Sequence, residues 1–317
     1  MTTTQEGVRR APEDDDLDLL TVVPARYPWR WVAGAVTLIV VATVVHGLIT
    51  NPAWEWSTVA IYVFNVAILE SVVLTLTLTF LGIVLGFLLG TVLALMRLSA
   101  SPLLRGVSWT YVWIFRSVPL ILQLLFWYNI AILYNRIELG IPFGPTLLSV
   151  STMSLIPPLG AATLGLTLHQ AAYSAEIVRS GLLSIDHGQL EAAAALGIPR
   201  RRQLSRIILP QAMRTIIPAA GNEIIGMVKG TSVVYIMALP ELFYQVQVIY
   251  QRTGRIIPML VVATIWYVLM TTVLSVGQYY VERHFSKGAA RNLAPTPLRR
   301  LRGLLADRRR ARTGEAS

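Results

Sequence analysis

The sequence predicts an all-α integral membrane protein with six transmembrane helices and both termini in the cytoplasm. Of its 317 residues, 54% are hydrophobic and only 14% are charged, and the mean hydropathy is +0.58. A soluble chain of this size would need a more charged surface. The net charge of +10 would also suit a nucleic-acid partner. However, the arginines lie at the ends of apolar runs, which indicates a lipid bilayer and no nucleic acid.

Six apolar segments approach the roughly 20 residues that a spanning helix needs. They are Trp31–Ile49, Ser71–Met96, Ser117–Tyr134, Pro158–Ile177, Ile216–Leu239 and Ile257–Tyr280. The second segment has no charged residue. The third and fourth are weaker, because polar residues interrupt them at Gln123, Asn129, His169 and Gln170.

The distribution of basic residues predicts the orientation. With both termini inside, nearly all of the 27 lysines and arginines fall on the cytoplasmic side. Only Arg136, Arg252 and Arg255 fall in external loops, and Lys229 lies within a span. Cytoplasmic loops carry the excess of positive charge in membrane proteins. The external loop 135–157 is long enough to have a function, and we expect it to contact another protein.

The two ends of the chain are expected to be cytoplasmic tails. Residues 1–30 include an acidic run and no secretory signal, and they are predicted to be disordered. Residues 283–317 form a basic tail. Between the tails, Trp31–Ile49 is predicted to be a separate N-terminal spanning helix.

A polar segment between the fourth and fifth spans predicts a short cytoplasmic helix. Asp186 and Gln189 have the spacing of a helix-capping box, and alanines fill the following turns. Gly197 supplies a C-terminal stop, and Pro199 prevents continuation. A smooth alanine face suits a partner's groove, but an ordinary helix on the membrane surface would have the same pattern.

The motifs in this region resemble the EAA signature of ABC-importer permeases. The matching residues are Glu191-Ala192-Ala193, Gly197, Ile207 and Leu209-Pro210. Flanking segments are similar to the polar amino acid branch of that family, at Arg116–Gln123, Ala172–Gly181, Gly188–Ala193, Asn222-Glu223, Lys229, Thr231-Ser232 and Glu241-Leu242. Gly230 and Val118 depart from residues common in relatives.

The resemblance implies a bacterial plasma-membrane permease with a five-span core over residues 70–282. It also implies a second permease subunit, a cytoplasmic ATPase dimer and an extracytoplasmic solute-binding protein. The chain lacks the glycine-rich phosphate-binding motif of an ATPase, so ATP would be hydrolysed by a separate chain. The segment 186–200 would then be the coupling helix, with the coupling residues Asp186, Gln189, Glu191, Ala192, Ala193, Gly197, Arg200, Leu209 and Pro210.

Ionisable and polar residues within spans are candidates for the substrate pathway, because they are costly in a membrane. We expect this role for Lys229, Thr231, Ser232, Asn222, Glu223 and Gln123. A lysine beside hydroxyl groups and a glycine would suit the carboxylate of an amino acid. Alternatives are pairing of Lys229 with an acidic residue, such as Glu223 or Glu176, and an outer gate. His169 is expected to be a hydrogen-bonded packing residue, and Glu176 and Arg179 a local ion pair.

Gly82, Gly86 and Gly90 recur on one face of the second span, which predicts close helix packing in preference to a pathway lining. The chain has no cysteine, and its four histidines have no metal-ligand spacing, so neither a metal nor a bound cofactor is expected.

The sequence thus indicates the permease subunit of an ATP-driven importer for a polar amino acid or a close derivative. A permease for another solute, such as an opine or a compatible solute, is the alternative. A secondary carrier is a weaker one, since the cytoplasmic helix would have no task. A membrane enzyme is disfavoured because no catalytic set can be identified.

Overall fold

A computed structural model describes residues 28–140 and 146–285, which divide into two units. In its described part, the first unit (Met1–Trp54) holds α1 (Pro28–Thr50) and a short 3-10 turn, η2 (Pro52–Trp54). The apolar residues of this helix are spread around all of its sides, and it is long and apolar enough to cross a membrane. The rest of the two predicted tails, 1–27 and 286–317, lies outside the described residues.

The second unit begins at Glu55, and its described residues are mainly helical, with one β-hairpin. Its elements are α2 (Trp56–Tyr62), α3 (Val66–Leu98), α4 (Pro102–Ser117), α5 (Leu120–Tyr128), α6 (Ile130–Leu133), β1 (Arg136–Gly140), β2 (Thr146–Ser151), α7 (Thr152–Leu155), α8 (Pro158–Leu183), α9 (His187–Ala195), α10 (Arg200–Gln203), the π-helical turn η3 (Leu204–Ile208), α11 (Leu209–Gly230), the 3-10 helix η4 (Thr231–Met237), α12 (Leu242–Thr253) and α13 (Ile256–Phe285).

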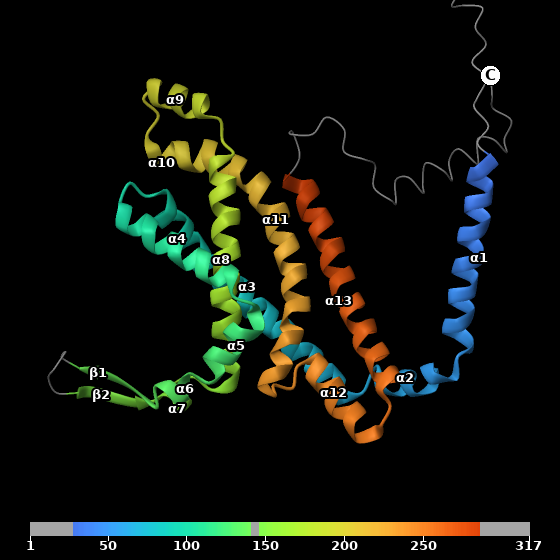
Figure 1. Cartoon of the computed structure of the whole chain (residues 1–317). Coiled ribbons are helices and arrows are strands. Elements are labelled where there is room, and N and C mark those ends of the chain that lie inside the picture. The colour runs from blue at the N-terminus through green and yellow to red at the C-terminus, as the bar shows by residue number, and fades with distance from the viewer. Residues whose placement is uncertain (1–27, 141–145, 286–317) are drawn as a thin grey trace, which may run out of the picture. The chain divides into compact units, whose positions relative to one another are not determined.

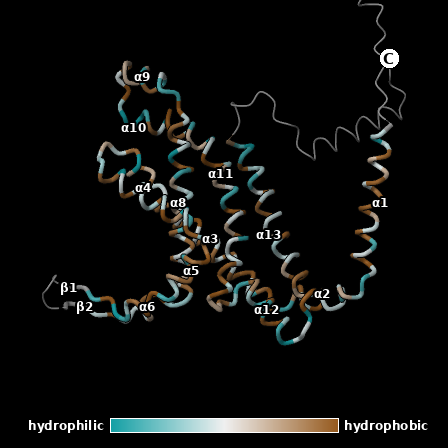
Figure 2. Tube along the Cα trace, in the orientation of Figure 1, coloured by the Kyte–Doolittle hydropathy of each residue, from teal (hydrophilic) through white to brown (hydrophobic). Residues whose placement is uncertain are grey.

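The long helices α3, α8, α11 and α13 form the body of this unit (Figure 1). Helices α9 and α10 lie at one end of the body, and the hairpin and α12 lie at the other. Figure 2 shows hydrophobic residues along much of α3 and hydrophilic residues around α10. The body thus has an apolar middle and a polar α9 end.

The three glycines of α3 face α8. A Cβ atom on Gly82 would lie 3.3 Å from the Cβ of Leu166, and one on Gly86 would lie 2.6 Å from the Cβ of Gln170. On Gly90 it would lie 2.8 Å from the carbonyl oxygen of Ala171. Only hydrogen fits at the last two positions, so the glycines allow the two backbones to approach closely.

Helix α8 is the centre of the bundle, in contact with α3, α4, α5 and α11. Many of its side chains are buried, including the polar Gln170 and Ser174. Because protein rather than lipid surrounds it, α8 can hold polar residues that a lipid-facing helix could not.

By length and composition, three described helices could cross a membrane: Trp29–Thr50, Val66–Leu98 and Ile256–Phe285. The number rises to five if two bent pairs each count as one span. Helix α8 does not pass this criterion, although the sequence predicts a span there. The expected helices therefore exist in the described residues, but the count of six is not reproduced.

The chain bends sharply at the start of the predicted third span, Ser117–Tyr134. Helices α4 and α5 meet at Val118-Pro119 with a bend of 103°. Proline lacks a backbone N–H and forces the preceding residue into an extended conformation, so the helix ends there. Helix α4 was not expected as a separate element.

Three further segments differ from the prediction. The external loop contains the antiparallel pair β1–β2, in which Arg136 pairs with Ser151, whereas the sequence predicts only helices. The fifth span changes from α-helix to 3-10 helix at Thr231. After the predicted stop at Gly197 and Pro199, a second short helix follows, α10, which was not expected.

Candidate functional site

A cavity of about 110 Å³ lies between α5, α8 and α11; four of its eight lining residues have polar side chains, and it is called the polar cavity below. Its lining residues are Leu120, His169, Gln170, Tyr173, Glu223, Gly226, Met227 and Gly230. The four from α11 have the spacing of one helix face. Polar groups from α8 and α11 therefore meet within the bundle.

Glu223 is the acidic group of this cavity. Its Oε2 accepts a hydrogen bond from Nε2 of Gln170 at 3.3 Å, and the same nitrogen donates to Oγ of Ser174 at 3.1 Å. Glu223 is half-buried. The ion pairs of the described residues, Arg179–Glu176 and Arg255–Glu55, do not include it. Its carboxylate thus has an amide partner and no cationic one in that part of the chain.

His169 faces the same cavity with an unused polar atom. Its Nδ1 is buried and has no hydrogen-bond partner among the described residues. Its ring lies 5.0 Å from the ring of Tyr173. The expected hydrogen-bonded packing is therefore not found at Nδ1, and buried groups of this kind require an explanation.

Of the six expected pathway residues, only Glu223 lines the cavity. Lys229 is exposed and lies outside it. Asn222 is also exposed, and its Oδ1 accepts a hydrogen bond from Nε2 of Gln278 on α13 at 3.2 Å. The two residues are seven positions apart and share a helix face away from Glu223.

Thr231 and Ser232 use their hydroxyl groups at the end of α11. Thr231 is buried, and its Oγ1 donates to the carbonyl oxygen of Val228 at 2.7 Å. Oγ of Ser232 donates to the carbonyl oxygen of Lys229 at 2.6 Å. These bonds satisfy carbonyl groups where the α-helix gives way to η4.

Gln123 supports the bend between α4 and α5. Its Nε2 donates to the carbonyl oxygens of Phe115 and Val118, both at 2.8 Å. The side chain is buried, and Oε1 has no hydrogen-bond partner among the described residues. The donor end of Gln123 therefore holds the broken helix together.

Gln170 and Tyr173 also line the cavity, and neither is among the expected pathway residues. Both lie in α8, where their spacing with His169 covers one face of the helix. A polar face of this kind within an apolar segment is the sequence feature that could have identified these two residues.

Helix α9 has local signals at both ends. Oδ1 of Asp186 accepts a hydrogen bond from the backbone N–H of Gln189 at 3.2 Å. At the other end, Gly197 has a φ of 65° and its N–H donates to the carbonyl oxygen of Ala194. The N–H of Ile198 donates to the carbonyl oxygen of Ala193. These bonds form a Schellman motif, which ends the helix as predicted.

The face of α9 that carries Gln189 and Leu190 packs against the ends of α8 and α11. Nε2 of Gln211 donates to Oε1 of Gln189 at 2.7 Å. Ile185, Ala212 and Ile216 form a buried cluster against which Leu190 packs. Helix α9 is thus connected to the two helices that carry the walls of the polar cavity.

The opposite face of α9 has no partner among the described residues. Glu191, Ala192 and Ala194 are exposed, whereas Ala193 is buried. Leu196 follows the helix and is 78% exposed. A face of small residues next to an exposed leucine is suited to a complementary groove.

The remaining expected coupling residues lie behind α9. Arg200 begins α10, Leu209 begins α11, and Pro210 lies in the first turn of α11. The π-helical turn η3 separates Arg200 from Leu209, and such turns are frequent at functional sites. No group of three or more potential metal ligands occurs in the described part of the chain.

Comparison with known proteins identifies the family. Residues 82–287 match the model described as the binding-protein-dependent transport system inner membrane component. The arginine transport system permease protein ArgU of Corynebacterium glutamicum is 43% identical over 278 residues, which cover 87% of this chain and 86% of ArgU. The glutamate/aspartate import permease protein GltK of Escherichia coli O157:H7 is 33% identical, over 68% of this chain and 92% of GltK.

A solved structure supports the same assignment. The crystal structure of an amino acid ABC transporter with histidines is 32% identical, has a TM-score of 0.58, and covers 69% of this chain and 94% of that chain. Members of this family work with an ATPase and a solute-binding protein. The chain therefore belongs to the inner membrane permease family of binding-protein-dependent importers, as a multi-pass bacterial membrane subunit of an amino acid ABC transporter.

Proposed function

We propose that this permease transports a cationic amino acid through the cavity at Glu223. The observation that carries the proposal is the half-buried carboxylate, which has no cationic partner among the described residues. Glu223 lies 14 residues after Leu209, or about 21 Å along the helix. A carboxylate at that depth is costly unless a cation accompanies it, and a guanidinium or ammonium group of the substrate would serve.

The α8 wall offers partners for the rest of the substrate. Nδ1 of His169 has an unused hydrogen-bonding position, and the Tyr173 side chain lines the same cavity. The relative named as an arginine permease is 43% identical, compared with 33% for the one named for glutamate and aspartate. This difference in identity favours a cationic substrate over an acidic one.

The substrate proposal is tested by uptake into vesicles that contain the complete importer. Labelled arginine should be taken up, and unlabelled lysine should compete better than glutamate. Glu223→Gln should raise KM by about tenfold or more, because a charge-assisted hydrogen bond contributes about 1.5–3 kcal/mol. Glu70→Gln makes the same charge change at an exposed position of α3 outside the cavity and should leave KM unchanged. Competition by glutamate alone would show that the assignment is wrong.

Helix α9 is proposed as the docking point for the ATPase dimer, through the coupling residues named above. Together with α10 and η3, it forms the connection between α8, which carries Gln170, and α11, which carries Glu223. A displacement of α9 would therefore change the separation of these two cavity walls. ATP binding would bias the permease between two states by this route. The full importer would contain two permease subunits, identical or different, and two ATPase subunits.

We also propose six spans with both termini in the cytoplasm. Residues 31–49 would be an extra span, 70–282 the permease core with the coupling segment 186–200, and 1–30 and 283–317 cytoplasmic tails. Residues 135–157 would face the solute-binding protein. The surroundings of α8 explain how a less apolar helix could span within this bundle.

The absence of cysteine allows a direct test of the topology. Single cysteines would replace Arg136, Ala194 and His284, which are all exposed. An impermeant maleimide should label Arg136→Cys in intact cells, and Ala194→Cys and His284→Cys only after permeabilisation. Labelling of Ala194→Cys in intact cells would reverse the proposed orientation.

A further inference from the structure

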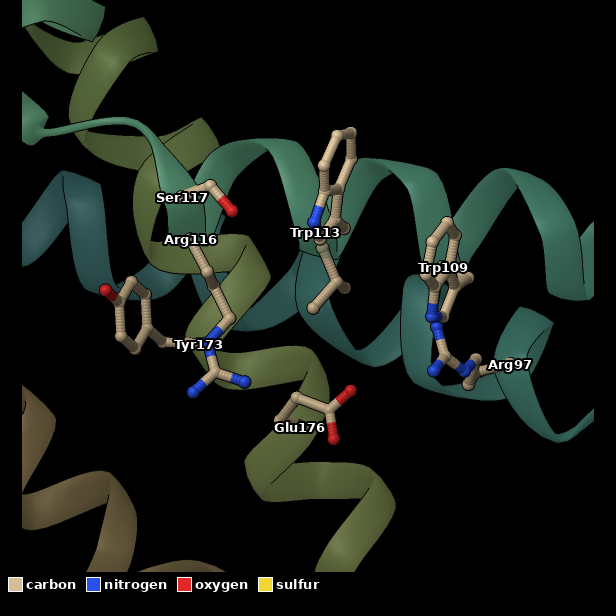
Figure 3. A pocket seen from close by; sticks show the side chains of 8 residues that line it. Arg97, Trp109, Trp113, Arg116, Ser117, Tyr173 and Glu176 are labelled. Atoms are coloured by element: carbon tan, nitrogen blue, oxygen red, sulfur yellow. The ribbon is translucent and has the colours of Figure 1, made fainter.

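A second cavity, of about 380 Å³, lies between the end of α3, α4 and α8 (Figure 3). Two arginines, three aromatic residues and one acid contribute to its lining: Arg97, Arg116, Trp109, Trp113, Tyr173 and Glu176. Except for Tyr173, these residues do not line the polar cavity at Glu223. The size and the arginines indicate that a small anionic group could bind here.

The guanidinium groups of Arg97 and Arg116 both have N–H groups that could donate hydrogen bonds to a bound anion. Nη1 of Arg97 is buried and has no hydrogen-bond partner among the described residues. The Cζ atom of Arg116 lies 5.2 Å from the centre of the Tyr173 ring. A guanidinium above a ring can still donate through its in-plane N–H groups.

The acid in the lining is already neutralised. Oε2 of Glu176 lies 2.7 Å from Nη2 of Arg179, as expected for a local ion pair. Neither Arg97 nor Arg116 belongs to an ion pair of the described residues. The cavity therefore has a net positive charge and an unfilled buried donor, a combination that favours a phosphate group.

The aromatic side of the cavity has the character of a membrane–water interface. Trp109 and Trp113 lie one turn apart on α4, with their rings parallel and 6.0 Å apart. They are 52% and 58% exposed. Indole rings gather at the level of lipid headgroups, where their apolar bodies and polar N–H groups are both satisfied.

The position of Arg97 along α3 also places it at the depth of the lipid headgroups. Glu70 and Arg97 are 27 residues apart in the continuous helix Val66–Leu98, or about 40 Å along its axis. A bilayer measures about 40–45 Å with its headgroup regions. When α3 spans the membrane, Arg97 therefore lies at the level of the headgroups.

We propose that this cavity binds the phosphate of an anionic phospholipid headgroup, with Arg97 and Arg116 as its donors and the tryptophan pair against the lipid. Basic pockets between spanning helices are suited to such headgroups. The exposed indoles favour a lipid over a free anion, since a dissolved phosphate would gain nothing from them. The same positive charge disfavours a cationic amino acid in this cavity.

The test measures retention of phosphatidylglycerol by the complete importer, transferred from nanodiscs of phosphatidylcholine with increasing phosphatidylglycerol. Arg97→Gln should weaken retention at least about fivefold, since one basic residue near a membrane surface contributes about 1 kcal/mol. Arg97→Lys, which keeps the charge, should restore most of it. Arg105→Gln is the matched control, because Arg105 is exposed on α4 and does not line the cavity.

Several results would overturn the proposal. Equal losses in Arg97→Gln and Arg105→Gln would indicate general surface charge, and unchanged retention in Arg97→Gln would exclude a role for that residue. Displacement of the lipid by millimolar inorganic phosphate would indicate a site for a free anion. A higher KM for arginine uptake in Arg97→Gln, with lipid retention unchanged, would place the cavity in the transport path.

Discussion

Replacing Gly197 should disconnect ATP hydrolysis from transport without disturbing the membrane part of the protein. Gly197 ends α9 with a φ of 65°, and a Cβ atom there would have no neighbour within 4 Å. Gly197→Val therefore adds no steric overlap with the rest of the chain, and its cost is the backbone conformation alone.

The size of this effect follows from the left-handed conformation. A residue with a Cβ atom pays roughly 1–2 kcal/mol there, and a β-branched residue is among the least suited. This energy lowers the population of the Schellman motif with both hydrogen bonds formed, relative to the open form, by about 5- to 30-fold. Because the motif sets the direction in which the chain leaves α9, the face with Glu191 and Leu196 would be presented less often in its present geometry.

The assay compares ATP hydrolysis and amino acid uptake in the same proteoliposomes. Gly197→Val should lower uptake per ATP hydrolysed at least about fivefold, whereas Gly197→Asn, which tolerates this conformation, should stay near the wild type. Gly254→Val is the matched control: Gly254 ends α12 with a φ of 72° and also has no neighbour within 4 Å of a Cβ position. Normal coupling in Gly197→Val, or equal loss in Gly254→Val, would refute the reasoning.

Two further substitutions test the contact between α3 and α8 and the cap at the start of α12. Gly86→Ala would bring a Cβ atom to 2.6 Å from the Cβ of Gln170, so the free energy of unfolding should fall by about 1–3 kcal/mol and uptake should decrease. Gly106→Ala has open space in α4 and is its control; equal thermal stability of the two variants would contradict the close α3–α8 contact. Glu241→Ala removes a buried carboxylate that accepts the N–H groups of Phe243 and Tyr244 at the start of α12, and it should cost about 1–3 kcal/mol in thermal or denaturant unfolding. An unchanged unfolding midpoint would show that this cap does not stabilise the fold.

Several helices of this protein could be located from the sequence because their signals are local. Apolar runs marked α1, α3 and α13, and the cap at Asp186 and the glycine at Gly197 marked both ends of α9. Pro119 was visible as well, but its consequence was not. A proline can lie in the first turn of a continuous span or end one helix before another, and only the packing of α4 against α3 and α8 decided for a bend of 103°.

The identity of the polar residues that share a cavity depended on tertiary structure much more strongly. Lys229 was the leading candidate from its charge and its neighbours, yet it is exposed and outside the cavity, whereas Glu223 lies within it. The sequence alone cannot show which face of α11 meets α8. That choice rests on close contacts such as Gly86 against Gln170, between residues far apart in the chain.

The sequence by itself indicated the class of protein: its composition and caps predict a membrane protein with a capped polar helix, and its motifs resemble those of importer permeases, which implies an ATPase on another chain. Composition, caps and motif spacing are properties of short segments, so they need no knowledge of the fold. The tertiary structure decided which polar groups meet, at Glu223 in one cavity and at Arg97 in another. A cavity is made by side chains from three helices at once, and their rotation and depth are determined only when the helices pack.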